Sequence, residues 1–354
     1  MSRDLRIRTH RRARGLVAVI GAAALASLAI AGPAAAQSSG DVNVSGSSTV
    51  EPITSLVAEL YAGKNPDVAV RVDGPGTGDG FKLFCSDETD ISDASRPIKP
   101  EEATACQSKA ITYTELPIGL DGLTVIVNKN SSLKLKCLSQ ADLYALFGPE
   151  STGDLATDSA LATQLGTKQG LPSTGTVKKF TPGPESGTYD AFIELGYQKI
   201  MDAQQAAGKI TDVTTDEKGK TVPAEPLISD GQFPNDNDIV KRVEGSKNGI
   251  GFLGIAYYTE NKSELKAVAI EDPTTGKCVK PTEKTVQNGT YLPLSRTLFI
   301  YVNNAKAGSN ASVKSFVDFY MTKKNLTKSV VEAGYAPLPP AKISESISTW
   351  KAAE

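Results

Sequence analysis

The stretch Asp121-Gly-Leu-Thr-Val-Ile-Val-Asn128, DGLTVIVN, is almost continuously apolar between two polar residues. A second stretch, Arg296-Thr-Leu-Phe-Ile-Tyr-Val-Asn303, RTLFIYVN, has the same character far along the chain. Runs of this kind are typical of strands that are buried on both faces of a sheet. Two interpretations stay open: the strands cross between two lobes, or they are ordinary core strands of one sheet.

Around these stretches, short β-rich runs alternate with amphipathic helical patterns. The hydrophobic spacing predicts further strands at 68–72 and 249–253, and helices at 53–61, 191–201 and 312–321. Such alternation is typical of α/β lobes, and the chain is long enough to form two separate cores. Two irregular segments are expected, a loop with a short helix at 151–177 and a surface excursion at 207–226.

The N-terminal segment reads as an export signal. Six arginines precede an apolar run from Leu16 to Ile30 and a small-residue site, Ala34-Ala-Ala36. Removing residues 1–36 takes six arginines and Asp4 from 38 basic and 40 acidic residues, which leaves a net charge of about −7. A mature chain this acidic argues against a nucleic-acid partner or an anionic membrane surface.

Four cysteines lie beyond the predicted signal: Cys85, Cys106, Cys137 and Cys278. An even number in an exported chain indicates two disulfides, and three pairings are possible. The pairing of Cys85 with Cys106 is favoured, because it closes a loop of about 20 residues and should stabilise the fold by roughly 3 kcal/mol. Cys137 with Cys278 would then follow by elimination. No CxxC spacing supports a zinc or thioredoxin-type site.

The mature chain contains no histidine, because His10 lies within the predicted signal. Ser-His-Asp and Cys-His nucleophile activation and histidine-ligated metals are therefore excluded. We expect neither a metal nor a cofactor. The acidic stretch Asn235-Asp-Asn-Asp238 lacks the spacing of a calcium loop and precedes a helical run, so helix capping is the expected role.

Three turns rich in glycine and hydroxyl residues each lead into a helical pattern. They contain Ser47-Ser-Thr49, Thr77 and Ser186-Gly-Thr188. A helix N-terminus presents unpaired N–H donors, and glycine allows the backbone to approach a ligand closely. Three such turns, if they converge, would bind an oxyanion without adding positive charge. A single turn of this kind is more often a simple N-cap, but three with so similar a layout favour a ligand role. Neither a P-loop nor a Rossmann fingerprint is present.

Seven ordered blocks resemble the phosphate-binding proteins of Pst-type ABC importers. The blocks are GSSTVEP at 46–52, GPGTGDGFKLFC at 74–85, ETDISDASRPI at 88–98, DGLTVIVN at 121–128, ESGTYDAF at 185–192, NGIGFLGIAYY at 248–258 and PLSRTLFIYVN at 293–303. The similarity continues to GYAPLP at 334–339 and covers nearly all of the mature chain. It implies a type II periplasmic binding protein, two α/β lobes joined by crossing strands, with 37–124 plus 296–354 as one lobe and 125–295 as the other.

The resemblance also implies the anion contacts. They are Ser48, Thr49 and the Val50 amide in the first turn, Thr77 in the second, and Ser186, Gly187 and Thr188 in the third. Two positions depart from the family pattern. Pro182 stands where the family often has an arginine. Ser95, itself a predicted phosphate contact, stands where the family often has an aspartate.

Arg96 is the predicted replacement for the missing guanidinium, because a guanidinium can bind two oxyanion oxygens at once. The alternative is that Arg96 braces its loop. Arg296 begins a crossing strand and is expected to brace the hinge instead. An acidic group that accepts the proton of phosphate would discriminate against sulfate, and Asp79, Asp93 and Glu185 are the candidates for it.

The resemblance implies a soluble, monomeric periplasmic protein that captures inorganic phosphate between its lobes and delivers it to an ABC permease in the inner membrane. Two alternatives are a phosphate sensor and a binding protein for another tetrahedral oxyanion. A third, a Ser/Lys hydrolase, rests on the SxxK spacings at 131–134 and 263–266. A pattern this short arises often by chance, so we expect no enzyme activity.

Overall fold

The computed structural model of the protein describes residues 40–184, 186–210, 212–215, 220–223 and 229–353. The predicted signal at 1–36 and the candidate acceptor Glu185 lie outside these residues.

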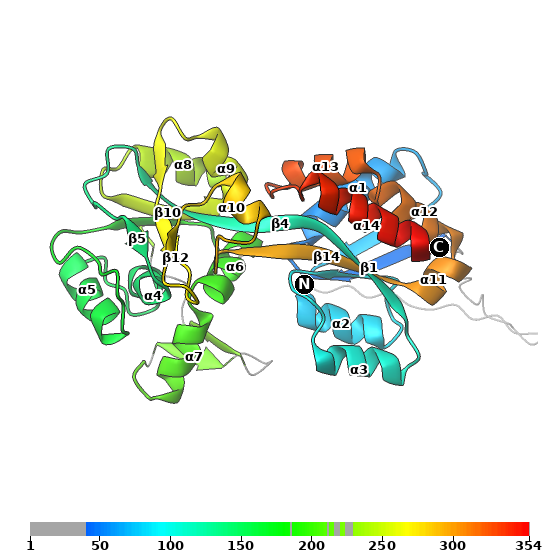
Figure 1. Ribbon diagram of the computed structural model, residues 1–354, viewed down its shortest axis with the longest axis horizontal. Coiled ribbons are helices and arrows are strands. Elements are labelled where there is room, and N and C mark those ends of the chain that lie inside the picture. The colour runs from blue at the N-terminus through cyan, green and yellow to red at the C-terminus, as the bar shows by residue number, and fades with distance from the viewer. Residues whose placement is uncertain (1–39, 185, 211, 216–219, 224–228, 354) are drawn as a thin grey trace, which may run out of the picture. The chain divides into compact units, whose positions relative to one another are not determined.

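One long strand organises the fold. β4 (Tyr113–Asn128) pairs along its first part with β14 (Ser295–Asn303) and along its second part with β10 (Gly249–Gly254), both antiparallel. Figure 1 shows β4 and β14 running side by side. The two stretches from which the fold was inferred are therefore neighbours in one sheet, and β4 continues from one set of strands into the next.

Within the described residues, this sheet has nine strands in the order β2-β1-β3-β14-β4-β10-β6-β9, with β11 also paired to β4. The remaining strands of the sheet are β1 (Val42–Gly46), β2 (Val70–Asp73), β3 (Ile91–Ala94), β6 (Lys178–Thr181), β9 (Gly231–Gln232) and β11 (Leu265–Ala267). Two small sheets are formed by β13 (Cys278–Val279), β12 (Ala269–Glu271) and β5 (Cys137–Leu138), and by β7 (Val213–Thr215) and β8 (Thr221–Pro223).

We call the β2-β1-β3-β14 side of the sheet, with the first part of β4, the first lobe, and the β10-β6-β9 side the second lobe. The first lobe carries α1 (Glu51–Ala62), α2 (Thr77–Cys85), α3 (Pro100–Ser108), α11 (Asn304–Ser309), α12 (Ala311–Tyr320), α13 (Lys323–Glu332) and α14 (Pro340–Ala353). The second lobe carries α4 (Gln140–Phe147), α5 (Leu155–Gln164), α6 (Gly187–Gly196), α7 (Gln198–Ala206), α8 (Asp236–Glu244), α9 (Ile255–Glu260) and α10 (Glu283–Gln287). Sheet pairing passes from β14 to β10 between Gly122 and Leu123, close to the predicted lobe boundary after residue 124, which stays a prediction.

Helix α1 forms for the reason that the sequence suggests. Ile53, Val57 and Tyr61 are four residues apart and all are buried, so one face of the helix packs on the sheet. Pro52 lies in the first turn, where its missing N–H removes no hydrogen bond. The order β1, turn, α1 therefore places the first hydroxyl turn at the end of a buried strand.

The predicted helix at 191–201 is wrong in extent. α6 ends at Gly196 and α7 begins at Gln198, with Tyr197 between them at φ −152° and ψ 9°. Glycine weakens a helix interior, and the Tyr197 ring is fully buried with its edge against Tyr144. Burial of this ring therefore outweighs continuation of the helical pattern.

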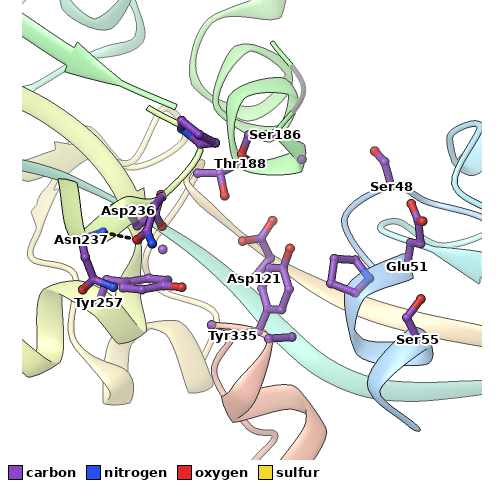
Figure 2. A pocket seen from close by; sticks show the side chains of 17 residues that line it. Ser48, Glu51, Ser55, Asp121, Ser186, Thr188, Asp236, Asn237, Tyr257 and Tyr335 are labelled. Carbon is purple, nitrogen blue, oxygen red and sulfur yellow. Dashed lines mark hydrogen bonds between the residues drawn. The ribbon is translucent and has the colours of Figure 1, made fainter. Parts of the chain in front are cut away.

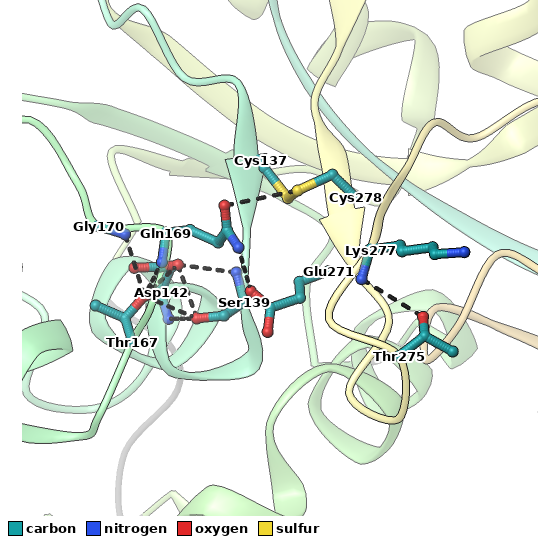
Figure 3. Close-up of a disulfide and its surroundings, with 10 residues drawn as sticks. All are labelled: Cys137, Ser139, Asp142, Thr167, Gln169, Gly170, Glu271, Thr275, Lys277 and Cys278. Carbon is teal, nitrogen blue, oxygen red and sulfur yellow. Dashed lines mark hydrogen bonds between the residues drawn. A yellow bond between two sulfur atoms is a disulfide. The ribbon is translucent and has the colours of Figure 1, made fainter.

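Two disulfides lie one in each lobe. Cys85 pairs with Cys106 and joins α2 to α3, and Cys137 pairs with Cys278 and joins β5 to β13. This is the pairing that loop closure favoured. Figure 3 shows the second bridge with the side chain of Gln169 nearby, whose amide donates to Glu271. Neither bridge links the two lobes to each other.

None of the helices in the described part of the chain combines the length and the apolarity that a membrane crossing requires.

Candidate functional site

The first turn connects β1 to α1 and is closed by its own hydrogen bonds. The Ser47 hydroxyl accepts from the Thr49 amide at 3.2 Å, and the Val50 amide donates to the Ser47 carbonyl at 3.0 Å. The predicted Val50 donor is therefore already used within the turn. Thr49 Oγ1 accepts a hydrogen bond of 3.1 Å from Arg296 Nη2, which ties the turn to strand β14.

The second turn lies against the first. Thr77 begins α2, and its hydroxyl accepts from the Ser95 amide at 3.2 Å, so two predicted contact residues are brought together. A Cβ atom on Gly74 would lie only 3.1 Å from the Cα of Ser48. Glycine at position 74 thus permits the close approach of the two turns.

The third turn reaches the first from the second lobe. Ser186 caps α6 by accepting from the Thr188 amide at 3.2 Å. A Cβ atom on Gly187 would lie 3.2 Å from the Ser48 carbonyl oxygen and 3.3 Å from the Cα of Thr49. The three turns are therefore adjacent, and the N-terminus of α6 meets the turn that precedes α1.

A cavity of about 560 Å³ opens beside the meeting point of the first and third turns. Figure 2 shows Ser48 and Glu51 on one side and Ser186 and Thr188 across from them, with Asp121 between. The lining is Ser48, Glu51, Pro52, Ser55, Asp121, Ser186, Gly187, Thr188, Pro234, Asn235, Asp236, Asn237, Gly254, Tyr257, Ala333, Gly334 and Tyr335. The cavity therefore draws on both lobes.

Asn235 caps α8 by accepting from the Asn237 amide at 2.9 Å, as the sequence predicted for this acidic stretch. Asp236 beside it faces the cavity, and burial raises the pKa of its carboxyl to about 6, against a hydrogen bond from the Gly254 amide. Within the described residues, no group of three or more acidic or cysteine side chains is placed to hold a metal ion.

Arg96 is engaged by a carboxylate of its own segment. Its Nη1 and Nη2 donate to the two carboxylate oxygens of Glu102 at 2.8 and 2.7 Å, and its guanidinium lies 5.6 Å from the centre of the Phe81 ring. Hydrogen bonding to Glu102 raises the pKa of Arg96, and the two bonds hold its guanidinium in place. The geometry matches the loop-bracing alternative, and the anion-binding role of Arg96 stays a prediction.

Arg296 hydrogen-bonds to Thr49, a predicted anion contact. Sequence reasoning missed this role of Arg296. It lies opposite Asp121 in the strand register and donates from Nε to Asp121 at 3.2 Å and from Nη1 to Glu194 at 2.9 Å. With the bond to Thr49, it joins β4, α6 and the first turn. The scarcity of arginine in the mature chain, four in all, was the one sequence signal that could have drawn attention to it.

The candidate proton acceptors are dispersed. Asp79 pairs with Lys82 on the surface of α2 at 3.0 Å. Asp93 is completely buried and accepts from the Thr54 hydroxyl at 3.0 Å. Burial raises the pKa of Asp93 to about 8, with the Thr54 bond opposing the shift and Glu51 adding to it. The acceptor stays unassigned among the three, because Glu185 is outside the described residues.

Comparison with known proteins gives a consistent result. A model of the PBP superfamily domain matches residues 31–324. Protein SphX of Synechococcus elongatus is 39% identical over 298 residues, which cover 84% of this chain and 77% of SphX. The phosphate-binding protein PstS of Staphylococcus haemolyticus is 34% identical over 312 residues, which cover 88% of this chain and 85% of PstS.

Solved structures agree with these relatives. The crystal structure of a possible phosphate binding protein from Planctomyces limnophilus matches with a TM-score of 0.73 and 34% identity, over 89% of this chain and 98% of that one. An ABC-type phosphate transport receptor from Vibrio cholerae matches in fold, with a TM-score of 0.55 and 22% identity over 84% of this chain and 100% of that one. The chain therefore belongs to the PBP superfamily, and within it to the family of the PstS phosphate-binding proteins.

Proposed function

We propose that the chain is an exported binding protein that captures inorganic phosphate between its two lobes and delivers it to an ABC permease. The observation that carries this proposal is the meeting of the hydroxyl turns. The Gly187 end of α6 packs within contact distance of Ser48 and Thr49, which brings hydroxyl-bearing turns from the two lobes close together.

The chemistry of these turns suits a small oxyanion. Hydroxyls and helix N-terminal amides donate hydrogen bonds and carry at most a partial positive charge. An acidic chain can therefore bind an anion without a basic surface, because the donors act only at short range. Phosphate is the first candidate, because the PstS relatives are named for binding it.

A binding role is also favoured over catalysis. The family is one of binding proteins, and the mature chain lacks histidine. The SxxK alternative has little support, since the Ser131 hydroxyl accepts from the Leu133 amide as a simple turn cap. Export to the periplasm, a monomeric state and an inner-membrane permease partner are parts of the proposal that rest on the sequence and on the relatives. A sensing role would use the same closing cleft.

The test is calorimetric titration of the mature protein, after unfolding and refolding to strip bound ligand, with phosphate and then sulfate. We expect micromolar or tighter phosphate binding, and selective binding would support a phosphate receptor. Binding of both anions would instead support a general receptor for tetrahedral oxyanions. Binding of neither would reject the proposed function while leaving the family assignment intact.

A matched pair of variants tests whether the meeting turns form the site. Gly187→Ala adds a methyl group 3.2 Å from the Ser48 carbonyl oxygen, so the two turns must shift slightly apart, and we expect about tenfold weaker phosphate binding. Gly308→Ala in α11 adds a methyl group with no atom within 4 Å and should leave binding unchanged. Equal affinity of the two variants would place the anion elsewhere.

A further inference from the structure

Arg296 holds three partners from three separate parts of the chain. Nε donates to Asp121 on β4, Nη1 to Glu194 on α6 and Nη2 to Thr49 in the first turn, at 3.2, 2.9 and 3.1 Å. The Arg296 side chain is only 10% exposed. A guanidinium fixed in this way has its two terminal nitrogens directed to the place where the lobes meet.

Its two carboxylate partners differ in exposure. The Asp121 side chain is 2% exposed and lies opposite Arg296 in the strand register, so its departure would leave a buried charge without a partner. The Glu194 side chain is 41% exposed and can be hydrated when it leaves the guanidinium. Water competes with an ion pair of this kind, so its net contribution is small. Asp121 is thus a fixed partner of Arg296, and Glu194 is an exchangeable one.

Thr49 is prepared for a ligand by the same guanidinium. Its hydroxyl oxygen accepts from Arg296 Nη2, and a hydroxyl that accepts one hydrogen bond still has its single O–H to donate. The turn that contains Thr49 packs against Gly187 at the start of α6. An oxyanion at this point would receive hydrogen bonds from the Thr49 hydroxyl and Arg296 together.

Glu194 occupies a locally positive position in an acidic protein. Partial burial raises the pKa of its carboxyl, but attraction and hydrogen bonding from Arg296, with weaker attraction from Lys220 and Arg96, lower it below the usual value. The cations that could bind an incoming anion therefore already attract the Glu194 carboxylate.

We propose that Glu194 is a built-in competitor of the ligand: its carboxylate holds the Arg296 donor that a bound oxyanion takes, and binding displaces it. This inference rests on the proposed function and deepens it. A dianionic oxyanion with several acceptor oxygens can replace one exposed carboxylate, because it engages Thr49 and Arg296 at once. A monocarboxylate has no such advantage. Glu194 thus favours the binding of dianionic oxyanions over that of monoanions, because a monoanion displaces its carboxylate less readily.

The test compares two variants that remove the same charge from the same helix. Glu194→Gln keeps the shape of the side chain but weakens its hold on Arg296, and we expect phosphate to bind roughly threefold to tenfold tighter. Asp190→Asn is the control, because Asp190 lies one turn earlier on α6 and also feels the charge of Arg296. The phosphate affinity of Asp190→Asn should change by less than about twofold. Acetate should bind measurably to Glu194→Gln and not to the wild type.

Several outcomes would overturn the inference. Unchanged affinity of Glu194→Gln, or an equal gain in Asp190→Asn, would mean that Glu194 acts at most through general charge. Weaker phosphate binding by Glu194→Gln, with a gain of sulfate binding, would make Glu194 the acceptor of the phosphate proton. If the wild type binds phosphate and Glu194→Gln binds it no more tightly, this inference alone is rejected. Absence of binding in both rejects the proposed function as well.

A structure of the phosphate complex gives an independent readout. Arg296 Nη1 should contact the anion, with Glu194 turned away, while the bond from Nε to Asp121 is retained. An intact Arg296–Glu194 bond in the complex would contradict displacement.

Discussion

Two serine–arginine pairs, Ser95–Arg96 and Ser295–Arg296, lie at the same end of the neighbouring strands β3 and β14. Arg96 is held by Glu102, six residues away in the chain. Arg296 is held by Glu194, Asp121 and Thr49, which are 102, 175 and 247 residues away. Similar dipeptides therefore have different structural roles. Arg96 bonds within its own segment, and Arg296 links distant parts of the chain.

The two regions also differ in how they treat a buried aspartate. Asp93, three residues before Arg96, accepts a hydrogen bond from the Thr54 hydroxyl. Asp121, opposite Arg296, bonds the guanidinium directly. A hydroxyl does little to stabilise a buried negative charge, whereas a guanidinium neutralises it. Burial raises the pKa of both carboxyls, but only at Asp121 does a guanidinium oppose the shift, so the first arrangement favours a protonated carboxyl and the second supports an ion pair beside the cavity.

The largest expected effect is loss of stability in Arg296→Ala. Without the guanidinium, Asp121 is a buried charge with no ionic partner, so the free energy of unfolding should fall by about 3–5 kcal/mol. Urea denaturation without ligand measures the change. Arg296→Lys should recover part of the loss, and adding Asp121→Asn to Arg296→Ala should recover more. In Arg96→Ala the free energy of unfolding should fall by only about 1 kcal/mol. Equal losses in the two alanine variants would show that the two arginines contribute alike to stability.

The next effect concerns the pH dependence that Asp93 contributes. The folded pKa of about 8 lies above the value near 3.9 of an unfolded aspartate, so the folded state holds the extra proton between these values. The stabilisation by Asp93 is therefore complete below pH 4 and is lost as pH rises through 8. Wild type should lose about 1 kcal/mol per pH unit relative to Asp93→Asn between pH 5 and 7. Parallel stability curves for the two proteins would show that Asp93 is ionised when folded.

The smallest effect is on ligand affinity in Arg96→Ala. Because Glu102 takes both terminal nitrogens of Arg96, phosphate affinity should fall by less than about threefold. Titration of this variant beside Glu102→Gln separates bracing from ligand contact, since both should then behave alike. A loss above tenfold in Arg96→Ala alone would restore Arg96 as an anion ligand.

Features set by neighbouring residues were predictable from the sequence. The apolar face of α1, the Ser186 and Asn235 caps and the short Cys85–Cys106 loop all depend on residues close in the chain. The hydroxyl turns could be singled out one at a time for the same reason. Their adjacency was expected only because the ordered blocks resembled a known family.

Features set by long-range packing were not predictable from pattern. The Glu194 side chain carries no sequence signal of its role, because that role depends on an arginine 102 residues away. The break at Tyr197 has a similar cause, since the buried ring packs against Tyr144 in another helix. Arg96 was preferred over Arg296 because the turn chemistry around it was visible, whereas the register that sets Arg296 opposite Asp121 was not.

The position of β14 in the sheet has a consequence for biosynthesis. β14 lies between β3 and β4, yet it follows every strand of the second lobe in the chain. The second lobe can therefore assemble on the second half of β4 while the first lobe still lacks its central strand. A nascent chain that ends before residue 295 exposes the unpaired edges of β3 and β4, which are templates for aggregation. The first lobe therefore stays open to edge-to-edge pairing until β14 has inserted between β3 and β4.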